Sequence, residues 1–218
     1  MSIGSFYKQS ARDGMITLQP SAKDLEAFRG MGALLPRAAA AAQRRAINKT
    51  LLWLRTHIAR AVSKQERIAV TAVRQRLRAY PVSGSAMRGK LWFGLDAIEA
   101  SRIGRARQTR KGVSVAGRRY AGAFYKKVYG GSADIWIRTA SKHFDANDYA
   151  DAKMGRRRTG FIHENSNRFP LAKAKVSLDE ARPHFNSWIK KADERLAEIL
   201  KQELNFELQK FLKGKSNV

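Results

Sequence analysis

Apolar side chains recur at spacings of three and four residues between Ala38 and Val62, which is the longest helical pattern in the chain. The members of this stripe are Ile47, Leu51, Leu54, Ile58, Ala61 and Val62. Such a stripe packs against another part of a fold, so the pattern predicts a long amphipathic helix with one buried face. The opposite face is basic and contains Arg44, Arg45, Lys49, Arg55 and Arg60. The sequence leaves open whether this cationic face is solvated or meets an acidic partner.

Signals on both sides of this segment predict where helices begin and end. Pro36 fits just ahead of the first turn, where a missing N–H costs little. Ser63 and Glu66 have the spacing of a capping box, which predicts that a second helix begins there and runs to about Ala79. Pro81 then ends it, because the residue before a proline avoids the helical conformation. Ahead of this helix pair, residues 1–37 are expected to form an arm, with a short strand at 15–18 and a brief helix from residue 21.

From Gly89 onward the pattern changes from helical to extended. Strands are predicted at residues 90–95, 97–103, 113–115, 120–129 and 134–138, with a basic loop at 104–112 and a tight Gly-Gly-Ser turn at 130–132. Residues 139–168 are polar and too long for a simple turn. A strand at 169–176 and an amphipathic helix at 185–212 follow. These are the marks of an antiparallel sheet built from hairpins and of a C-terminal helix.

The pattern as a whole predicts an α+β fold with an N-terminal helix pair, a central antiparallel sheet with hairpins and a C-terminal amphipathic helix. The expected organisation is an N-terminal arm with a short helix at 1–37 and a single α+β domain at 38–212, followed by a tail at 213–218. The long polar loop at 139–168 belongs to that domain.

Composition adds a large excess of positive charge. The chain has 43 Lys and Arg against 18 Asp and Glu, a net charge of +25. Such an excess repels itself in a free monomer and attracts polyanions, so nucleic acid or an acidic protein is an expected partner. Cysteine is absent, which excludes disulfides and cysteine-based zinc sites. The chain shows neither a membrane-spanning run nor a signal-peptide pattern, so we expect a soluble protein made in the cytoplasm, with no membrane partner.

Candidates for catalysis are few. His163 and Glu164 begin a zinc-protease motif, but the position where the second histidine belongs is Asn167. Asp145, Asp148 and Asp151 are spaced for a helical turn, and an acidic patch that offsets nearby arginines explains them better than a metal site does. A phosphate-binding loop is also missing from the sequence. We therefore predict a non-enzyme without a metal or cofactor.

The stronger signal is a basic cluster in the region of the predicted hairpins. No acidic residue occurs between residues 102 and 127, a segment that contains Arg102, Arg105, Arg107, Arg110, Lys111, Arg118, Arg119, Lys126 and Lys127. Such a cluster neutralises phosphates. Tyr120, Phe124 and Tyr125 lie among these residues, where they either stack on bases or, the favoured interpretation, face a sheet core. A second patch consists of Arg156, Arg157 and Arg158.

Several segments, in the order in which they occur, resemble a known family. Residues 45–50 (RAINKT) lie in the long helix, and residues 112–115 (GVSV) precede residues 118–124 (RRYAGAF). The hairpin strand ending at Arg138 and the strand at 168–171 come before a C-terminal helix. In this order the chain resembles the phage minor tail protein Z family, the tail-completion proteins of lambda-like tails. The resemblance covers roughly residues 38–138 and 168–212.

The resemblance implies a structural virion protein at the neck, a ring-forming subunit that joins the tail to the head connector and helps to position the DNA end. The implied partners are further copies of the chain, tail tube or terminator proteins and the head connector, with the tape measure protein and genomic DNA as further candidates. The implied location is the virion tail or neck, after assembly in the host cytoplasm. The alternative, from charge alone, is a basic cytoplasmic nucleic-acid-binding module.

Overall fold

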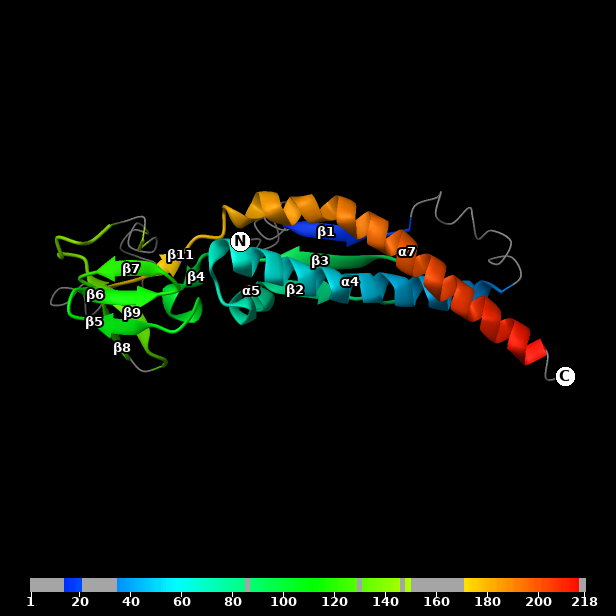
Figure 1. Ribbon diagram of the computed structural model, residues 1–218, viewed down its shortest axis with the longest axis horizontal. Coiled ribbons are helices and arrows are strands. Elements are labelled where there is room, and N and C mark those ends of the chain that lie inside the picture. Colours follow the sequence, from blue (N-terminus) through cyan, green and yellow to red (C-terminus); the bar gives the residue numbers. More distant parts are fainter. Residues whose placement is uncertain are drawn as a thin grey trace, which may run out of the picture. The chain divides into compact units, whose positions relative to one another are not determined.

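The computed structural model describes residues 14–20, 35–84, 87–128, 131–145, 148–149 and 171–215 (Figure 1). These residues form a mixed α+β fold with two long helices and several small antiparallel sheets, which confirms the predicted fold class. The chain divides into two compact units. The first contains Met1–Ala61, Arg74–Gly94 and Arg182–Val218, and the second contains Val62–Val73 and Leu95–Ala181. The expectation of one domain over residues 38–212 stays a prediction.

Two long helices and a three-stranded sheet form the first unit. Helix α4 spans Pro36–Glu66, and helix α7 spans Ala181–Lys215, so each predicted helix is confirmed and is longer than expected. In the sheet, β3 (Gly89–Phe93) lies between β1 (Met15–Leu18) and β2 (Leu77–Tyr80), and both pairings are antiparallel. The predicted short strand at 15–18 is therefore confirmed.

One face of this sheet is apolar and packs against both helices. Its buried side chains are Ile16, Leu18, Leu77, Leu91 and Phe93. Helix α4 comes so close that a Cβ added to Gly89 would lie 2.5 Å from Cγ2 of Ile47. The ring of Phe93 lies 5.4 Å, centroid to centroid, from that of Phe185 in α7. Figure 1 shows α4 and α7 running side by side along the sheet. The core of this unit therefore lies between the helix pair and the sheet.

The predicted capping box at Ser63 and Glu66 is wrong, because α4 continues through both residues. The helix ends instead in a Schellman motif, in which the N–H of Ile68 donates to the carbonyl of Ser63 at 3.1 Å. Arg67 takes the left-handed conformation that this motif needs, with φ of 52°. The Ser63 hydroxyl donates to the carbonyl of Ile68 at 2.6 Å. The same four-residue pattern thus closes one helix and does not open another.

The second predicted helix is also shorter than expected. Helix α5 spans Val70–Arg76, and the residues predicted as its last turn form strand β2. In β2, Leu77 pairs with Phe93 and Tyr80 pairs with Lys90. This pairing with β3 satisfies backbone groups and buries Leu77, so contacts between distant segments outweigh the local helical spacing.

The second unit is built from short antiparallel strands. One sheet contains β5 (Arg107–Thr109), β6 (Gly112–Val115) and β7 (Arg118–Ala121) in that order. Another contains β8 (Phe124–Lys126), β9 (Asp134–Arg138) and β10 (Leu171–Lys173), with β9 in the middle. Strand β4 (Ile98–Glu99) pairs with β11 (Lys175–Val176). The predicted antiparallel hairpins are therefore confirmed, although they form several sheets.

Several local predictions in this unit are wrong. Residues 120–129, predicted as one strand, belong to β7 and β8 in two sheets, and the described part of the strand predicted at 169–176 divides in the same way into β10 and β11. The strand expected over 97–103 is limited to Ile98–Glu99, because Ala100–Arg102 form a 3₁₀ helix, η1. The segment predicted as a basic loop at 104–112 contains strand β5 and the first residue of β6. Its sequence has little strand character of its own, and pairing with β6 makes it extended. The helix predicted from residue 21 and most of the polar loop at 139–168 lie outside the described residues.

Candidate basic interaction surface

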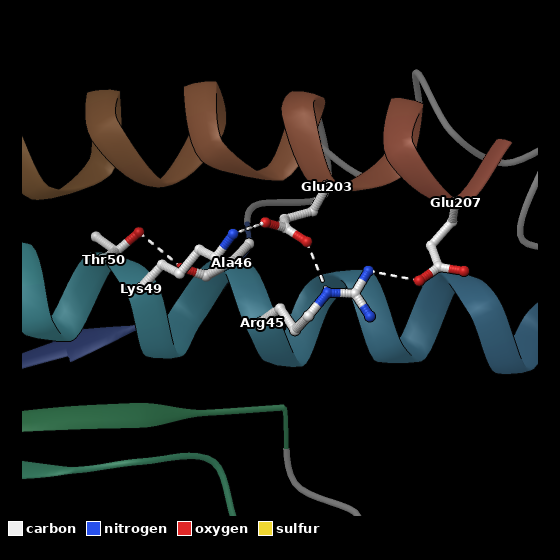
Figure 2. Close-up of polar contacts among 6 residues, drawn as sticks. All are labelled: Arg45, Ala46, Lys49, Thr50, Glu203 and Glu207. Atoms are coloured by element: carbon white, nitrogen blue, oxygen red, sulfur yellow. Dashed lines mark hydrogen bonds and ion pairs between the residues drawn. The ribbon is translucent and has the colours of Figure 1, made fainter. Parts of the chain in front are cut away.

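The basic face of α4 meets acidic residues of α7 within the first unit. Nε of Arg45 lies 2.6 Å from Oε2 of Glu203, and Nη2 of the same arginine lies 2.6 Å from Oε1 of Glu207 (Figure 2). Lys49 donates to the other oxygen of Glu203. Thr50, one residue further on, is fully buried and donates to the carbonyl of Ala46 at 2.8 Å. The acidic partner that the sequence left open is thus, for Arg45 and Lys49, part of the same chain.

The carboxylate of Glu203 remains charged because of its partners. Glu203 is only 6% exposed and Glu207 only 9% exposed. Burial raises the pKa of Glu203, but the hydrogen bonds from Lys49 and Arg45 lower it by more, so that its pKa lies below the ordinary value of 4.5. The cluster therefore neutralises part of the basic face of α4 and links the two helices.

Other basic residues of α4 have backbone partners in the same unit. Nε of Arg55 donates to the carbonyl of Leu77 at 3.0 Å, at the point where α5 gives way to β2. Nη2 of Arg44 donates to the carbonyl of Gly84 at 3.3 Å. Arg60 is exposed and has no polar partner among the residues that the structure describes. Of the five basic positions predicted on α4, four therefore contribute to the fold of the first unit.

The sheet β5–β6–β7 of the second unit has an open basic face. Arg107 of β5 pairs with Ser114 of β6, and Ser114 pairs with Arg119 of β7, so these three residues form one row across the sheet. Directly paired residues of antiparallel strands project to the same face. Arg107 and Arg119 are exposed, and Ser114 is half-buried. The two arginines are separated by two inter-strand spacings, about 10 Å.

The next row on this face contains small residues. Thr109 pairs with Gly112, and Gly112 pairs with Ala121. The two-residue turn between β5 and β6 adds Arg110 and Lys111, which are both exposed, and Arg105 is exposed just before β5. We call Arg105, Arg107, Arg110, Lys111 and Arg119 the sheet cations. In the described part of the chain, none of the sheet cations has a hydrogen-bonding or ion-pair partner for its side chain.

The other face of the same sheet belongs to the core of the second unit. Val113, Val115 and Tyr120 are buried there. Burial raises the pKa of Tyr120 to about 12, and the charge of Asp148 adds to the effect. The favoured interpretation of Tyr120 as a core residue is therefore confirmed. Tyr125 differs, because its side chain is 39% exposed on β8.

Arg118 lies on the core side and closes the end of α4. Its Nη2 donates to the carbonyl of Glu66 at 2.9 Å and its Nη1 to the carbonyl of Arg67 at 3.5 Å. These carbonyls lie at a helix C-terminus, where the partial charge is negative and a cation is favourable. Arg118 and Arg119 are thus neighbours in sequence with different surroundings, one inside the unit and one on the open face.

Arg102 also has a partner within the second unit. Its Nε lies 2.7 Å from Oε2 of Glu99, and Nζ of Lys173 lies 3.1 Å from the other oxygen. Lys173 also lies 2.9 Å from Oδ2 of buried Asp134, whose Oδ1 accepts the Ser101 hydroxyl at 2.5 Å. Burial lowers the pKa of Lys173, and the bonds to Asp134 and Glu99 more than offset this, so the pKa lies above its ordinary value. This network connects η1, β4, β9 and β10.

Some predicted positions lie outside the described residues. Arg156, Arg157 and Arg158 are among them, as is Asp151 of the aspartate series. Among the residues that the structure describes, no group of three His, Cys, Asp or Glu is arranged to hold a metal ion. Likewise, no helix in the described ranges is long and apolar enough to cross a membrane.

The sequence analysis missed the residues that complete the open face of the β5–β6–β7 sheet and the ion-pair cluster between α4 and α7. Ser114 and Thr109 become part of the open face only through the strand register, which the local sequence does not give. Glu203 and Glu207 had a detectable signal, because they lie four residues apart beside the apolar stripe of α7. An acidic pair at that spacing in one helix and a basic pair at Arg45 and Lys49 in another indicate helix pairing.

The fold is α+β, and one face of the β5–β6–β7 sheet carries exposed basic side chains. The model of the prophage minor tail protein Z (GPZ) family matches residues 25–214, which is most of the chain, and the chain therefore belongs to this family. The family consists of structural phage tail proteins and not enzymes, and other tail proteins are its partners. No curated protein and no solved structure matches the chain significantly.

Proposed function

We propose that this minor tail protein is a tail-completion subunit that forms a ring at the neck, joins the tail to the head connector and helps to position the DNA end. The family match supports a tail protein, and the finer role is our inference. The observation that carries it is a set of exposed apolar side chains near the end of α7. Phe206, Leu208 and Leu212 are 59%, 41% and 56% exposed. Leu208 and Leu212 are four residues apart and share one side of the helix, whereas Phe206 lies on the side of Arg45, whose guanidinium carbon is 5.7 Å from the ring centroid. Exposed apolar residues that share a face mark interaction sites, and a ring subunit needs such surfaces for its neighbours.

The proposed partners follow from this place in the particle. They are further copies of the chain, tail tube or terminator proteins and the head connector, with the tape measure protein and genomic DNA as further candidates. The proposed location is the virion, in the tail or neck, after assembly in the host cytoplasm. The basic surface contributes to the proposal because acidic neighbours or DNA are the partners that an excess of positive charge selects.

Gold-labelled antibody against the protein, imaged on intact particles by electron microscopy, tests the location. Label at the head–tail junction is the expected result. If intact particles carry no label although the epitope is accessible in disrupted virions, the proposed location at the neck is contradicted. Native mass spectrometry of the purified chain and of isolated tails tests the ring, for which we expect a closed oligomer in at least one of the two samples.

The second candidate is a cytoplasmic nucleic-acid-binding module, and the open face of β5–β6–β7 favours it. A monomer that binds nucleic acid tightly and stays absent from particles would support this alternative. Nucleic-acid binding alone does not separate the two candidates, because a neck protein also meets DNA. Presence in the particle and oligomeric state are therefore the deciding measurements.

A further inference from the structure

We propose that the open face of the β5–β6–β7 sheet binds the phosphate backbone of DNA without regard to sequence. This inference adds to the proposed function by assigning DNA to one surface of the protein. It rests on the proposed function only for the position in the particle, the neck, where the protein would meet DNA. The contact itself depends on the sheet cations, Ser114 and the register of the sheet.

The geometry of the face suits a row of phosphates. Arg107 and Arg119 lie on the two outer strands, about 10 Å apart, and only the short side chain of Ser114 lies between them. Successive phosphates of one DNA strand advance by about 3.4 Å along the helix axis and also rotate about it, so they lie farther apart than this advance. Two arginines about 10 Å apart can therefore reach separate phosphates of one strand. The Ser114 hydroxyl, which has no partner among the described residues, can donate to the phosphate between the arginines.

Among the residues that the structure describes, no ion pair compensates the charge of the sheet cations. The carboxylates that neutralise Arg45, Lys49 and Arg102 have no counterpart near the sheet cations in the sequence, because residues 100–133 contain no Asp or Glu. The turn cations Arg110 and Lys111 extend the positive surface beyond the strands. Binding a polyanion releases its condensed counterions, which provides the driving force without further contacts.

The composition of the face favours nucleic acid over a protein partner. Stable protein interfaces need a desolvated centre with large apolar or aromatic anchors. Among the described residues of β5, β6 and β7, no large apolar side chain is exposed. The exposed apolar residues of α7 lie in the first unit, which is therefore the better place for protein contacts.

The face also lacks the means to read bases. Asn and Gln are the side chains that recognise adenine in the major groove. The one such residue of the sheet, Gln108, is used by the fold. Its amide donates to the carbonyls of Gly112 at 3.1 Å and Ala123 at 3.4 Å, and its oxygen accepts the N–H of Tyr125 at 2.7 Å. We therefore expect binding that depends on salt and not on sequence.

The test compares two double variants of the full chain that lose the same charge. R107Q/R119Q removes the two arginines of the row on the open face. R74Q/R78Q removes two exposed arginines of the first unit whose side chains have no polar partner among the described residues. The probe is a fluorescent 20-base-pair duplex in two unrelated sequences, titrated at several salt concentrations. Thermal unfolding of all three proteins shows that each variant is folded.

We expect the wild type to bind both duplexes equally, with an affinity that falls steeply with salt. In R107Q/R119Q the affinity should fall about tenfold, and the slope of log K against log salt should decrease by about 2, close to 0.9 for each lost phosphate contact. R74Q/R78Q should keep the wild-type slope. An equal loss of DNA affinity in both variants would mean that only the total charge of the protein matters. An unchanged slope in R107Q/R119Q would mean that DNA does not bind this face. Either result overturns the proposal.

The outcome separates this inference from the proposed function. If R107Q/R119Q loses DNA binding while antibody labels no particle, the face binds DNA and the neck assignment fails. If R107Q/R119Q binds DNA like the wild type but is excluded from tails, the face is a protein interface, which overturns the inference and leaves the neck assignment intact.

Discussion

Arg45 of α4 and Glu203 of α7 are 158 residues apart in sequence, and their side chains form an ion pair with an N–O distance of 2.6 Å. Glu203 is almost completely buried and also holds Lys49, so a single carboxylate joins the two long helices. We expect Glu203→Gln to lower the free energy of unfolding of the first unit by about 1–3 kcal/mol, because two cations lose their charged partner.

Urea unfolding followed by tryptophan fluorescence measures this change, since Trp53, Trp92 and Trp188 all belong to the first unit. The matched control is Glu198→Gln, which removes an exposed carboxylate that pairs with Arg195 on the same helix. This control should cost less than about 0.5 kcal/mol, as exposed pairs of that kind do. Equal effects of the two substitutions would contradict a special role for Glu203.

The same carboxylate predicts how stability depends on pH. The pKa of Glu203 is lower in the folded chain than its ordinary value of 4.5. The stability that the charged Glu203 contributes is therefore fully present above pH 4.5 and is lost as the pH falls through the pKa of the folded state. The difference in unfolding free energy between wild type and Glu203→Gln should be constant near neutral pH and shrink in acid. A difference that stays constant into strong acid would show that the charge of Glu203 is not what stabilises the helices.

The same substitution should destabilise the protein at Arg118 and have little effect on stability at Arg119. Arg118→Gln removes donors from the carbonyls of Glu66 and Arg67, so we expect the second unit to lose about 1 kcal/mol or more of stability. The Arg119 side chain has no polar partner among the described residues, so Arg119→Gln should change the free energy of unfolding by less than about 0.5 kcal/mol. Thermal unfolding compares the two. Loss of stability in Arg119→Gln would show that its side chain has a partner in the fold.

Gly112 is the glycine on which the β5–β6 hairpin depends. Its φ is 143°, and a Cβ at this position would lie 2.1 Å from the carbonyl oxygen of Tyr120. Gly112→Ala should therefore destabilise the second unit by about 2 kcal/mol or more, because both the backbone conformation and the strand pairing are opposed.

Gly117 provides the control for that substitution, because its φ of 81° is also left-handed but a Cβ there would meet only Nη1 of Arg67 at 3.8 Å. Gly117→Ala should cost about 1 kcal/mol, from the conformation alone. Hydrogen exchange of the amides in β6 reports the two changes locally. A larger effect at Gly117 than at Gly112 would contradict the contact with Tyr120.

The parts of the fold that the sequence predicts are those with a long, regular period. The stripes of α4 and α7 extend over many turns, and each therefore indicates its helix without knowledge of the rest of the chain. Short elements are different. Residues 77–80 fit a helical spacing and a strand equally well, and only the pairing of Leu77 with Phe93 decides between the two.

The end of α4 shows the same limit at a single residue. A serine followed three residues later by a glutamate is the pattern of a capping box at the start of a helix, but Ser63 and Glu66 lie in the last turn of α4. The spacing alone therefore does not distinguish the start of a helix from its end. The difference is the left-handed conformation of Arg67, a position where glycine is the usual signal. With an arginine at this position, the sequence contains no mark of the helix end.

The sequence shows which basic residues are available for the candidate site, but it does not show which of them lie on the open face. The run of basic residues from Arg102 to Arg119 is visible in the sequence. Which of them are used by the fold is set by strand register and by partners far along the chain, such as Glu99 for Arg102 and the end of α4 for Arg118. Alternation along β7 would have separated Arg118 from Arg119 once the strand was known.

The pair formed by Arg45 and Glu203 also bears on the order in which the chain is made. Translation delivers α4 first and α7 last, and residues 95–181, which are most of the second unit, are made between them. The first unit therefore lacks one of its two long helices until residue 203 has left the ribosome. The second unit, whose residues are contiguous apart from Val62–Val73, can fold during that interval. A nascent chain at this stage therefore has the residues of the complete second unit, while its first unit still lacks α7.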